Sequence, residues 1–132
     1  MALVTPSSPS MDVSTGELAP QITGLTAGED LLAVAPCYIK TTDGKVYMSN
    51  GTAANEAAEF AGCTARATKS GQPTTLFALG AQFRYAVFSG QAGDKLYIAA
   101  TAGRLDTTAS TGDAVGVARV IDAERIQITR II

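Results

Sequence analysis

Short runs of alternating apolar and polar residues, separated by glycine-containing turns, fill this chain from residue 31 to its end. In "KLYI", Leu96 and Ile98 alternate with their neighbours, and Val115 and Val117 are expected to face the same way. A period of two residues places alternate side chains on one face of a strand. Because many such runs follow one another at close intervals, the sequence predicts a mainly β fold, either a small antiparallel β-barrel or a β-sandwich.

The stretch "CYIKTTDGKVYMS", residues 37–49, gives the clearest local signal, which is that of a β-hairpin. Asp43 and Gly44 suit a two-residue type I′ turn, whose two central residues both take positive φ. Such a turn would pair Thr42 with Lys45 and thereby set the register of the whole hairpin.

One short helix is predicted over residues 51–63, "GTAANEAAEFAGC". Thr52 can cap its start, Glu56 lies in its first turns, and Gly62 can end it. A helix of about two turns is too short to be stable alone, so it would depend on packing against the strands.

Charge and proline content divide the chain into two parts. No basic residue precedes Lys40, and residues 1–27 hold three of the five prolines. We therefore predict an extended N-terminal arm over 1–27 and a compact β domain over 28–132. The arm is either a tail that is disordered in the isolated molecule or a segment that orders on a partner. In the second case its apolar residues would anchor it: Leu3, Val4, Met11, Val13, Leu18 and Ile22. Deletion of the arm is expected to leave the domain folded.

Composition excludes several classes of function. The 132 residues fit one domain, and the chain has no His, which removes the usual general base and metal ligand at neutral pH. A net charge of −2 without a Lys/Arg cluster argues against direct nucleic-acid binding. We find neither a secretory signal nor an apolar stretch long enough to span a membrane, so we expect a protein made in the cytoplasm, without a membrane partner.

Cys37 and Cys63 are the only cysteines, too few for a disulfide framework. We interpret them as buried, reduced thiols that pack like small apolar side chains. A bridge between them remains an alternative that depends on the distance between their Cα atoms.

Asp94 and Asp113, each preceded by glycine, form the best candidate pair of catalytic carboxylates. A working pair would have to face a common cleft. Aspartate beside glycine more often caps backbone N–H groups in a turn, so we predict that both are structural, and that replacement by Asn costs little stability. A weak Ca²⁺ site is conceivable, but the spacing matches no calcium-loop motif. The sequence predicts no catalytic residue, no cofactor and no metal site, and hence no enzyme.

Several motifs follow one another in a defined order. They are "AGEDL", "YIKTTDGKVY", "FAGCTARA", "SGQPTTLFALG", "AGDKLYIAATAGRLDTT" and "GDAVGVARVID". In this order, from about residue 25 to the end, the chain resembles the capsid cement, or head decoration, proteins of tailed bacteriophages.

The resemblance implies a virion structural protein that lies on the outer surface of an assembled head and stabilises it. It implies a homotrimer that binds the major capsid protein, with an N-terminal arm that adds a strand to the capsid lattice. The apolar residues of the arm are then the candidates for capsid contact, and the mechanism would be β-augmentation with multivalency. Two alternatives are another phage structural module, such as a tail or head-fibre base, and a small hydrolase or sugar-binding domain.

Overall fold

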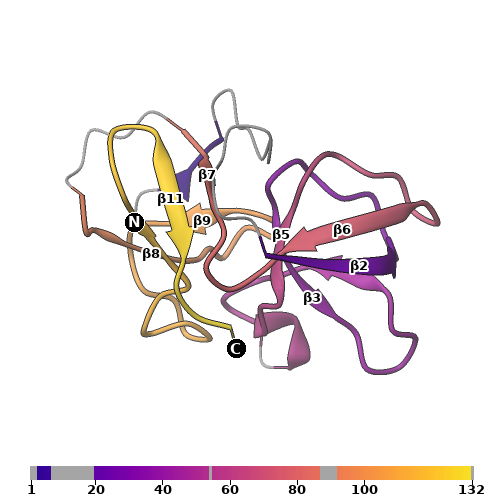
Figure 1. Cartoon of the computed structure of the whole chain (residues 1–132). Coiled ribbons are helices and arrows are strands. Elements are labelled where there is room, and N and C mark those ends of the chain that lie inside the picture. Colours follow the sequence, from indigo (N-terminus) through magenta and orange to yellow (C-terminus); the bar gives the residue numbers. More distant parts are fainter. Residues whose placement is uncertain (1–2, 7–19, 54, 87–91, 132) are drawn as a thin grey trace.

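The computed structural model describes residues 3–6, 20–53, 55–86 and 92–131. These residues form two antiparallel β-sheets and a single three-residue 3₁₀ helix (Figure 1). The prediction of a mainly β fold is confirmed. Within the described ranges the two sheets are open and sandwich-like, and they do not close into a barrel.

The first sheet has five strands and is built from residues 21–77. Its strands, in spatial order, are β2 (Gln21–Thr26), β6 (Pro73–Phe77), β5 (Gly62–Thr64), β3 (Pro36–Ile39) and β4 (Val46–Met48). Beyond β2 the chain crosses to the far edge of this sheet. There Ala27 forms a parallel bridge with Val46, and the Gly28 amide donates to the Val46 carbonyl.

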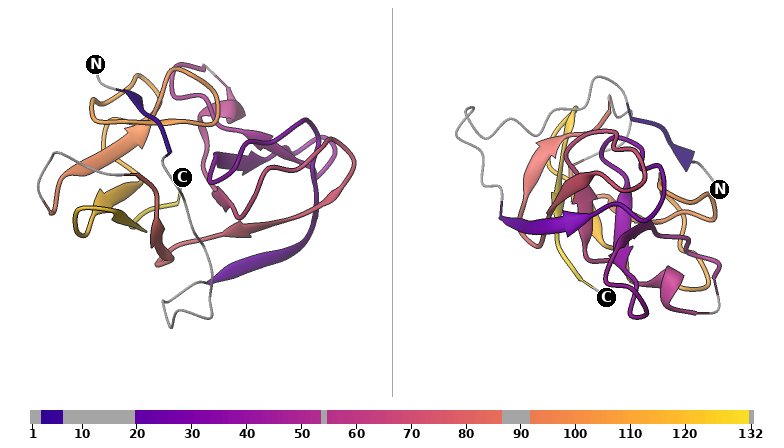
Figure 2. Two further views of the ribbon diagram at one scale, coloured as in Figure 1. Left: turned by 90° about the horizontal axis from the view of Figure 1, so that it is seen from above. Right: turned by 90° about the vertical axis from the view of Figure 1, so that its right-hand side faces the viewer.

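The second sheet has six strands, and all but one of them come from the C-terminal half of the chain. Their spatial order is β1 (Leu3–Val4), β9 (Leu105–Asp106), β8 (Lys95–Ile98), β10 (Ala118–Val120), β11 (Arg125–Ile128) and β7 (Gln82–Arg84). The two sheets occupy opposite halves of the molecule in Figure 1 and again from above in Figure 2.

Two apolar clusters form the core, and the two cysteines belong to different ones. The larger cluster joins the sheets and includes Cys63 of β5, whereas the smaller one lies within the five-stranded sheet and includes Cys37 of β3. Cys37 pairs with Gly62 and Pro36 with Cys63, so the two thiols lie on neighbouring strands but face different clusters. Both are buried and free, which confirms the interpretation as packed thiols.

The hairpin forms, but its predicted register is wrong by two residues. Tyr38 pairs with Tyr47, and the Lys40 amide donates to the Lys45 carbonyl, so Thr42 does not pair with Lys45. A shift of two keeps each side chain on its predicted face, because the side chains of a strand alternate with period two.

The cause of the shift is the loop that Asp43 prefers. A type I′ turn would need positive φ at Asp43 as well as at Gly44, but only Gly44 has it, at 68°. In the longer loop the Asp43 carboxylate accepts from the Lys45 amide at 2.9 Å and from the Tyr47 hydroxyl at 2.7 Å. These two bonds favour a wider turn than the sequence motif alone indicates.

The predicted two-turn helix is also wrong. Only Glu56–Ala58 is helical, as a single 3₁₀ turn capped by Asn55 rather than by Thr52. Phe60 is drawn into the larger core cluster, and Gly62 does not end a helix but begins β5. Residues that the helix would have needed therefore belong to strand β5 and to the core instead.

The predicted border between arm and domain at residue 27 does not coincide with a border in the structure. Residues 21–26 form β2, which pairs with β6, and Ala27 is fully buried. Leu3 and Val4 also form a strand. Deletion of residues 1–27 would therefore remove two edge strands, and we no longer expect it to leave the domain unaffected.

The strand pattern near the C-terminus agrees with the sequence except at one position. Leu96, Ile98 and Val117 are buried as predicted, but Val115 is 54% exposed. The reason is the irregular segment before β10, where Gly116 has a φ of 99°, so the regular alternation of a strand does not extend back to Val115. The alternation of buried and exposed residues begins only beyond that segment.

Candidate functional site

The carboxylate of Asp113 is enclosed by protein donors. Its side chain is fully buried, with one oxygen accepting from the Ile98 amide at 2.9 Å and the other from the Gly116 amide at 2.8 Å. Arg130 Nη1 lies 3.2 Å from the second oxygen and supplies the opposite charge. Asp113 thus connects β8, the turn before β10 and the C-terminal segment, in agreement with its predicted structural role.

Asp94 lies in a different environment. It is exposed in the turn that precedes β8, and its backbone carbonyl accepts from the Val120 amide at 2.8 Å. A carboxylate inside the protein and one on its surface do not face a common cleft. The structure therefore does not bring Asp94 and Asp113 together as a catalytic pair.

Asp43 and Gly44 form the tip of the β3–β4 hairpin. Hydrogen bonds from the Lys45 amide and the Tyr47 hydroxyl lower the pKa of Asp43 below its usual value. Lys40 lies 5.0 Å from the centre of the Tyr47 ring, and this cation–π contact supports the same hairpin. The charged groups of this turn are therefore used to hold its conformation.

The described residues contain no group of three or more His, Cys, Asp or Glu side chains placed to hold a metal ion. In the same residues, no helix has both the length and the apolar character needed to cross a bilayer.

β1 holds the first two candidate contact residues, Leu3 and Val4, at the edge of the six-stranded sheet. Leu3 pairs with Asp106 and Val4 with Leu105. Val4 packs against the larger core cluster, and its carbonyl accepts from the Tyr85 hydroxyl at 3.3 Å. Leu3 points the other way and is 45% exposed. β1 is thus fixed on one side by the core and presents an apolar side chain on the other.

β2 holds the candidate Ile22 at the edge of the five-stranded sheet. Ile22 and Leu25 pack against the smaller core cluster, and the register with β6 shifts between them. Gly24, with a φ of 78°, lies at this irregularity. Its conformation allows an extra residue on β2, which bends the edge strand away from regular pairing. The remaining candidates, Met11, Val13 and Leu18, lie outside the described residues.

A row of cationic side chains on the outer face of the six-stranded sheet was missed by the sequence interpretation. Lys95 of β8 pairs with Arg119 of β10, which in turn pairs with Gln127 of β11. The sequence does contain a sign of this row, because Lys95, Arg119 and Gln127 each occupy an outward position in an alternating run. The strand order that makes them neighbours could not be read from the sequence.

No protein-family model matches the chain, and no curated protein matches it significantly.

Proposed function

We propose that this protein is a virion structural protein that decorates and stabilises the outer surface of an assembled phage head. It docks as a homotrimer on the major capsid protein, and its N-terminal segment contributes to the contact. The order of motifs along the sequence suggests this function, and one structural observation supports it: each of the two N-terminal strands is the outermost strand of its sheet.

An outermost strand has one row of backbone donors and acceptors directed away from its own sheet. A segment of a partner can pair with that row, as in β-augmentation, and alternate side chains then add specificity. At β1 the exposed side chain of Leu3 would enter an apolar site of the partner. A trimer would present three copies of this contact, so modest individual affinities would combine into stable attachment.

The two carboxylates considered for catalysis, Asp94 and Asp113, support a structural role. Both oxygens of Asp113 accept from internal donors, and Asp94 lies apart from it on the surface. A hydrolase or sugar-binding domain would need polar groups that converge in an apolar cleft. Because Asp94 and Asp113 do not meet in such a cleft, the surface module is favoured over a hydrolase that would use this pair.

The test compares two exposed leucines, Leu3 and Leu32, which are 45% and 39% exposed. Purified wild-type protein, Leu3→Ser and Leu32→Ser are each incubated with undecorated heads, and bound copies per head are counted against concentration. Burial of the exposed half of a leucine side chain is worth about 1 kcal/mol, so Leu3→Ser should weaken binding about fivefold. Leu32→Ser should bind like the wild type, and both variants should keep its melting temperature.

Absence of saturable binding by the wild-type protein would refute head decoration. A copy number of a few per particle, rather than hundreds, would favour the alternative of a tail or head-fibre base. Mass measurement of the protein in solution tests the homotrimer separately.

A further inference from the structure

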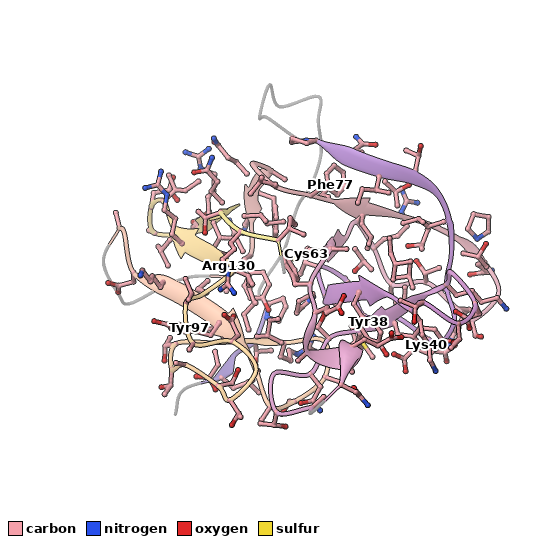
Figure 3. All side chains as sticks on the ribbon, turned by 90° about the horizontal axis from the view of Figure 1, so that it is seen from below. Tyr38, Lys40, Cys63, Phe77, Tyr97 and Arg130 are labelled. Atoms are coloured by element: carbon pink, nitrogen blue, oxygen red, sulfur yellow. The ribbon has the colours of Figure 1, made fainter. Side chains whose placement is uncertain are left out.

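The outer face of the six-stranded sheet carries two pairs of cations directly opposite each other. Lys95 faces Arg119 across β8 and β10, and Arg125 faces Arg84 across β11 and β7. Figure 3 shows nitrogen-tipped side chains gathered over the yellow strand of this sheet. Like charges at directly opposed positions destabilise a sheet unless another group compensates them.

The two pairs differ in how their charge is compensated. Arg84 forms an ion pair with Glu124, and Arg125 forms one with Asp122 at 2.8 Å. In contrast, neither cation of the Lys95–Arg119 pair forms an ion pair with a described carboxylate. Arg119 instead donates to the neutral side chain of Gln127 at 3.2 Å. One cation pair of this face is therefore left without a counter-charge from the described parts of the chain.

A hollow of about 360 Å³ lies beside this uncompensated pair. Lys95 and Arg119 contribute two cations to its lining, and Thr129 contributes a hydroxyl. The third cation of the lining, Arg130, is already balanced by Asp113. The lining also includes Val115, one of the most exposed apolar side chains of the described residues. We call this site the basic hollow.

We propose that the basic hollow binds an acidic segment of the partner protein, with a partner carboxylate between Lys95 and Arg119. A carboxylate there would accept from both cations and relieve their mutual repulsion. Val115 would contact an apolar side chain next to the acidic residue. This inference rests on the proposed function to the extent that the partner is the capsid protein. It places a second contact on the face of the six-stranded sheet, over the central strands β8 and β10, rather than at an edge strand.

The surroundings favour a discrete carboxylate over a nucleic acid. A polyphosphate chain would continue past the hollow along the same face. There it would meet the carboxylates of Asp122 and Glu124, which are about half exposed and lie beside the second cation pair. Positive and negative charges alternate on this face, as expected of a surface that binds a protein with a complementary charge pattern.

The decisive variant is Lys95→Glu/Arg119→Glu, with Lys45→Glu/Arg66→Glu as its matched control. Both change the net charge by the same amount, but the control residues lie on the half of the molecule built around the five-stranded sheet. Glutamates at 95 and 119 again oppose like charges, so the fold should tolerate them as it tolerates the natural pair. If the first variant does not fold, Lys95→Gln/Arg119→Gln is used in its place. This variant removes the repulsion, so it should raise the melting temperature at low salt.

The first measurement is binding to undecorated heads at low and high salt. The Lys95→Glu/Arg119→Glu variant should bind at least tenfold more weakly than the wild type at low salt, and the difference should shrink at high salt. The control should stay within twofold of the wild type. Equal weakening of both variants, or of neither, would overturn the proposal.

The second measurement does not depend on the head. A hexaglutamate peptide and a short DNA duplex are titrated into isotope-labelled protein, and backbone amide shifts are followed. The peptide should shift the amides of Lys95, Gly116 and Thr129 in the wild type and not in the Glu variant. This result would support the hollow even if the wild type fails to bind heads, an outcome that refutes only the proposed function. No shift with the peptide, or a stronger effect of the duplex, would overturn the assignment.

Discussion

Replacement of Asp113 by Asn tests how the C-terminal half of the fold is held together. Both carboxylate oxygens accept a backbone N–H, from Ile98 and Gly116. Asn has one acceptor oxygen, so its NH₂ group must face one of these amides. A buried donor left unsatisfied costs about 1–3 kcal/mol. Arg130 also loses its counter-charge, but its side chain is 34% exposed, so water limits this loss to about 1 kcal/mol or less.

The two effects together predict that Asp113→Asn lowers the free energy of unfolding by about 2–4 kcal/mol, or roughly 10 °C in melting temperature. This replaces the expectation, based on turn geometry alone, that Asn would be tolerated at both aspartates. Asp94→Asn is the control, because Asp94 is exposed, and it should change stability by less than about 0.5 kcal/mol. Urea unfolding of the three proteins measures the difference. Equal stabilities for the two variants would refute the argument that the internal hydrogen bonds of Asp113 support the fold.

Three further predictions concern stability and reactivity. Gly44→Val should cost about 1–3 kcal/mol, since a β-branched residue would be forced to a φ of 68°, and an unchanged melting temperature would contradict this. Burial raises the pKa of the Cys37 and Cys63 thiols, so neither should react with a thiol reagent at neutral pH until the protein unfolds, when both should react. Hydrogen bonds from the Glu124 amide and the Arg125 side chain lower the pKa of Asp122 to about 2, from an ordinary value of 3.8. The stabilisation by Asp122 is therefore complete above its ordinary pKa and is lost as the pH falls towards 2, so Asp122→Asn should make stability less dependent on pH in that window.

Strand alternation was enough to predict which side chains of the C-terminal half are buried. Leu96 and Ile98, like Ile126 and Ile128, are buried at every second position, as a period of two requires. The exception, Val115, shows the limit of this reasoning. Its orientation depends on a turn fixed by Asp113, whose donors come from segments distant in sequence.

In the N-terminal half, the helix prediction was wrong because local helix propensity competed with tertiary packing. The predicted helix had an acceptable capping residue and high alanine content, but Phe60 and Gly62 contribute more as members of the core and of β5. At Gly62 an added Cβ would lie 2.5 Å from the Phe77 carbonyl, so only glycine allows β5 to approach β6. No local pattern reveals that kind of close approach.

The order of strands could not be predicted from the sequence, and the candidate contact surfaces depend on that order. Residues 21–26 look like part of a proline-rich, acidic arm until their pairing with β6 is known. Lys95 and Arg119 are separated by more than twenty residues, and they become neighbours only because β10 lies between β8 and β11. A short alternating run specifies its own two faces but not which run lies beside it.

The way in which the sheet edges are protected bears on where a partner can pair. At β4, Glu29 accepts from the Met48 amide at 2.8 Å and the Gly28 amide donates to the Val46 carbonyl, so this edge is covered. At β2, the irregularity around Gly24 bends the strand, a known means of preventing unwanted pairing.

β1 is protected differently, by being only two residues long. A strand of that length supplies too few hydrogen bonds to recruit a random extended chain, and this matters for a protein that would be present in many copies on one shell. It gains specificity only when a partner also accommodates Leu3 and offers a second contact. Under the proposed function, the basic hollow would supply that second contact, so loss of either one should weaken binding, and loss of both should reduce it by about the product of the two effects.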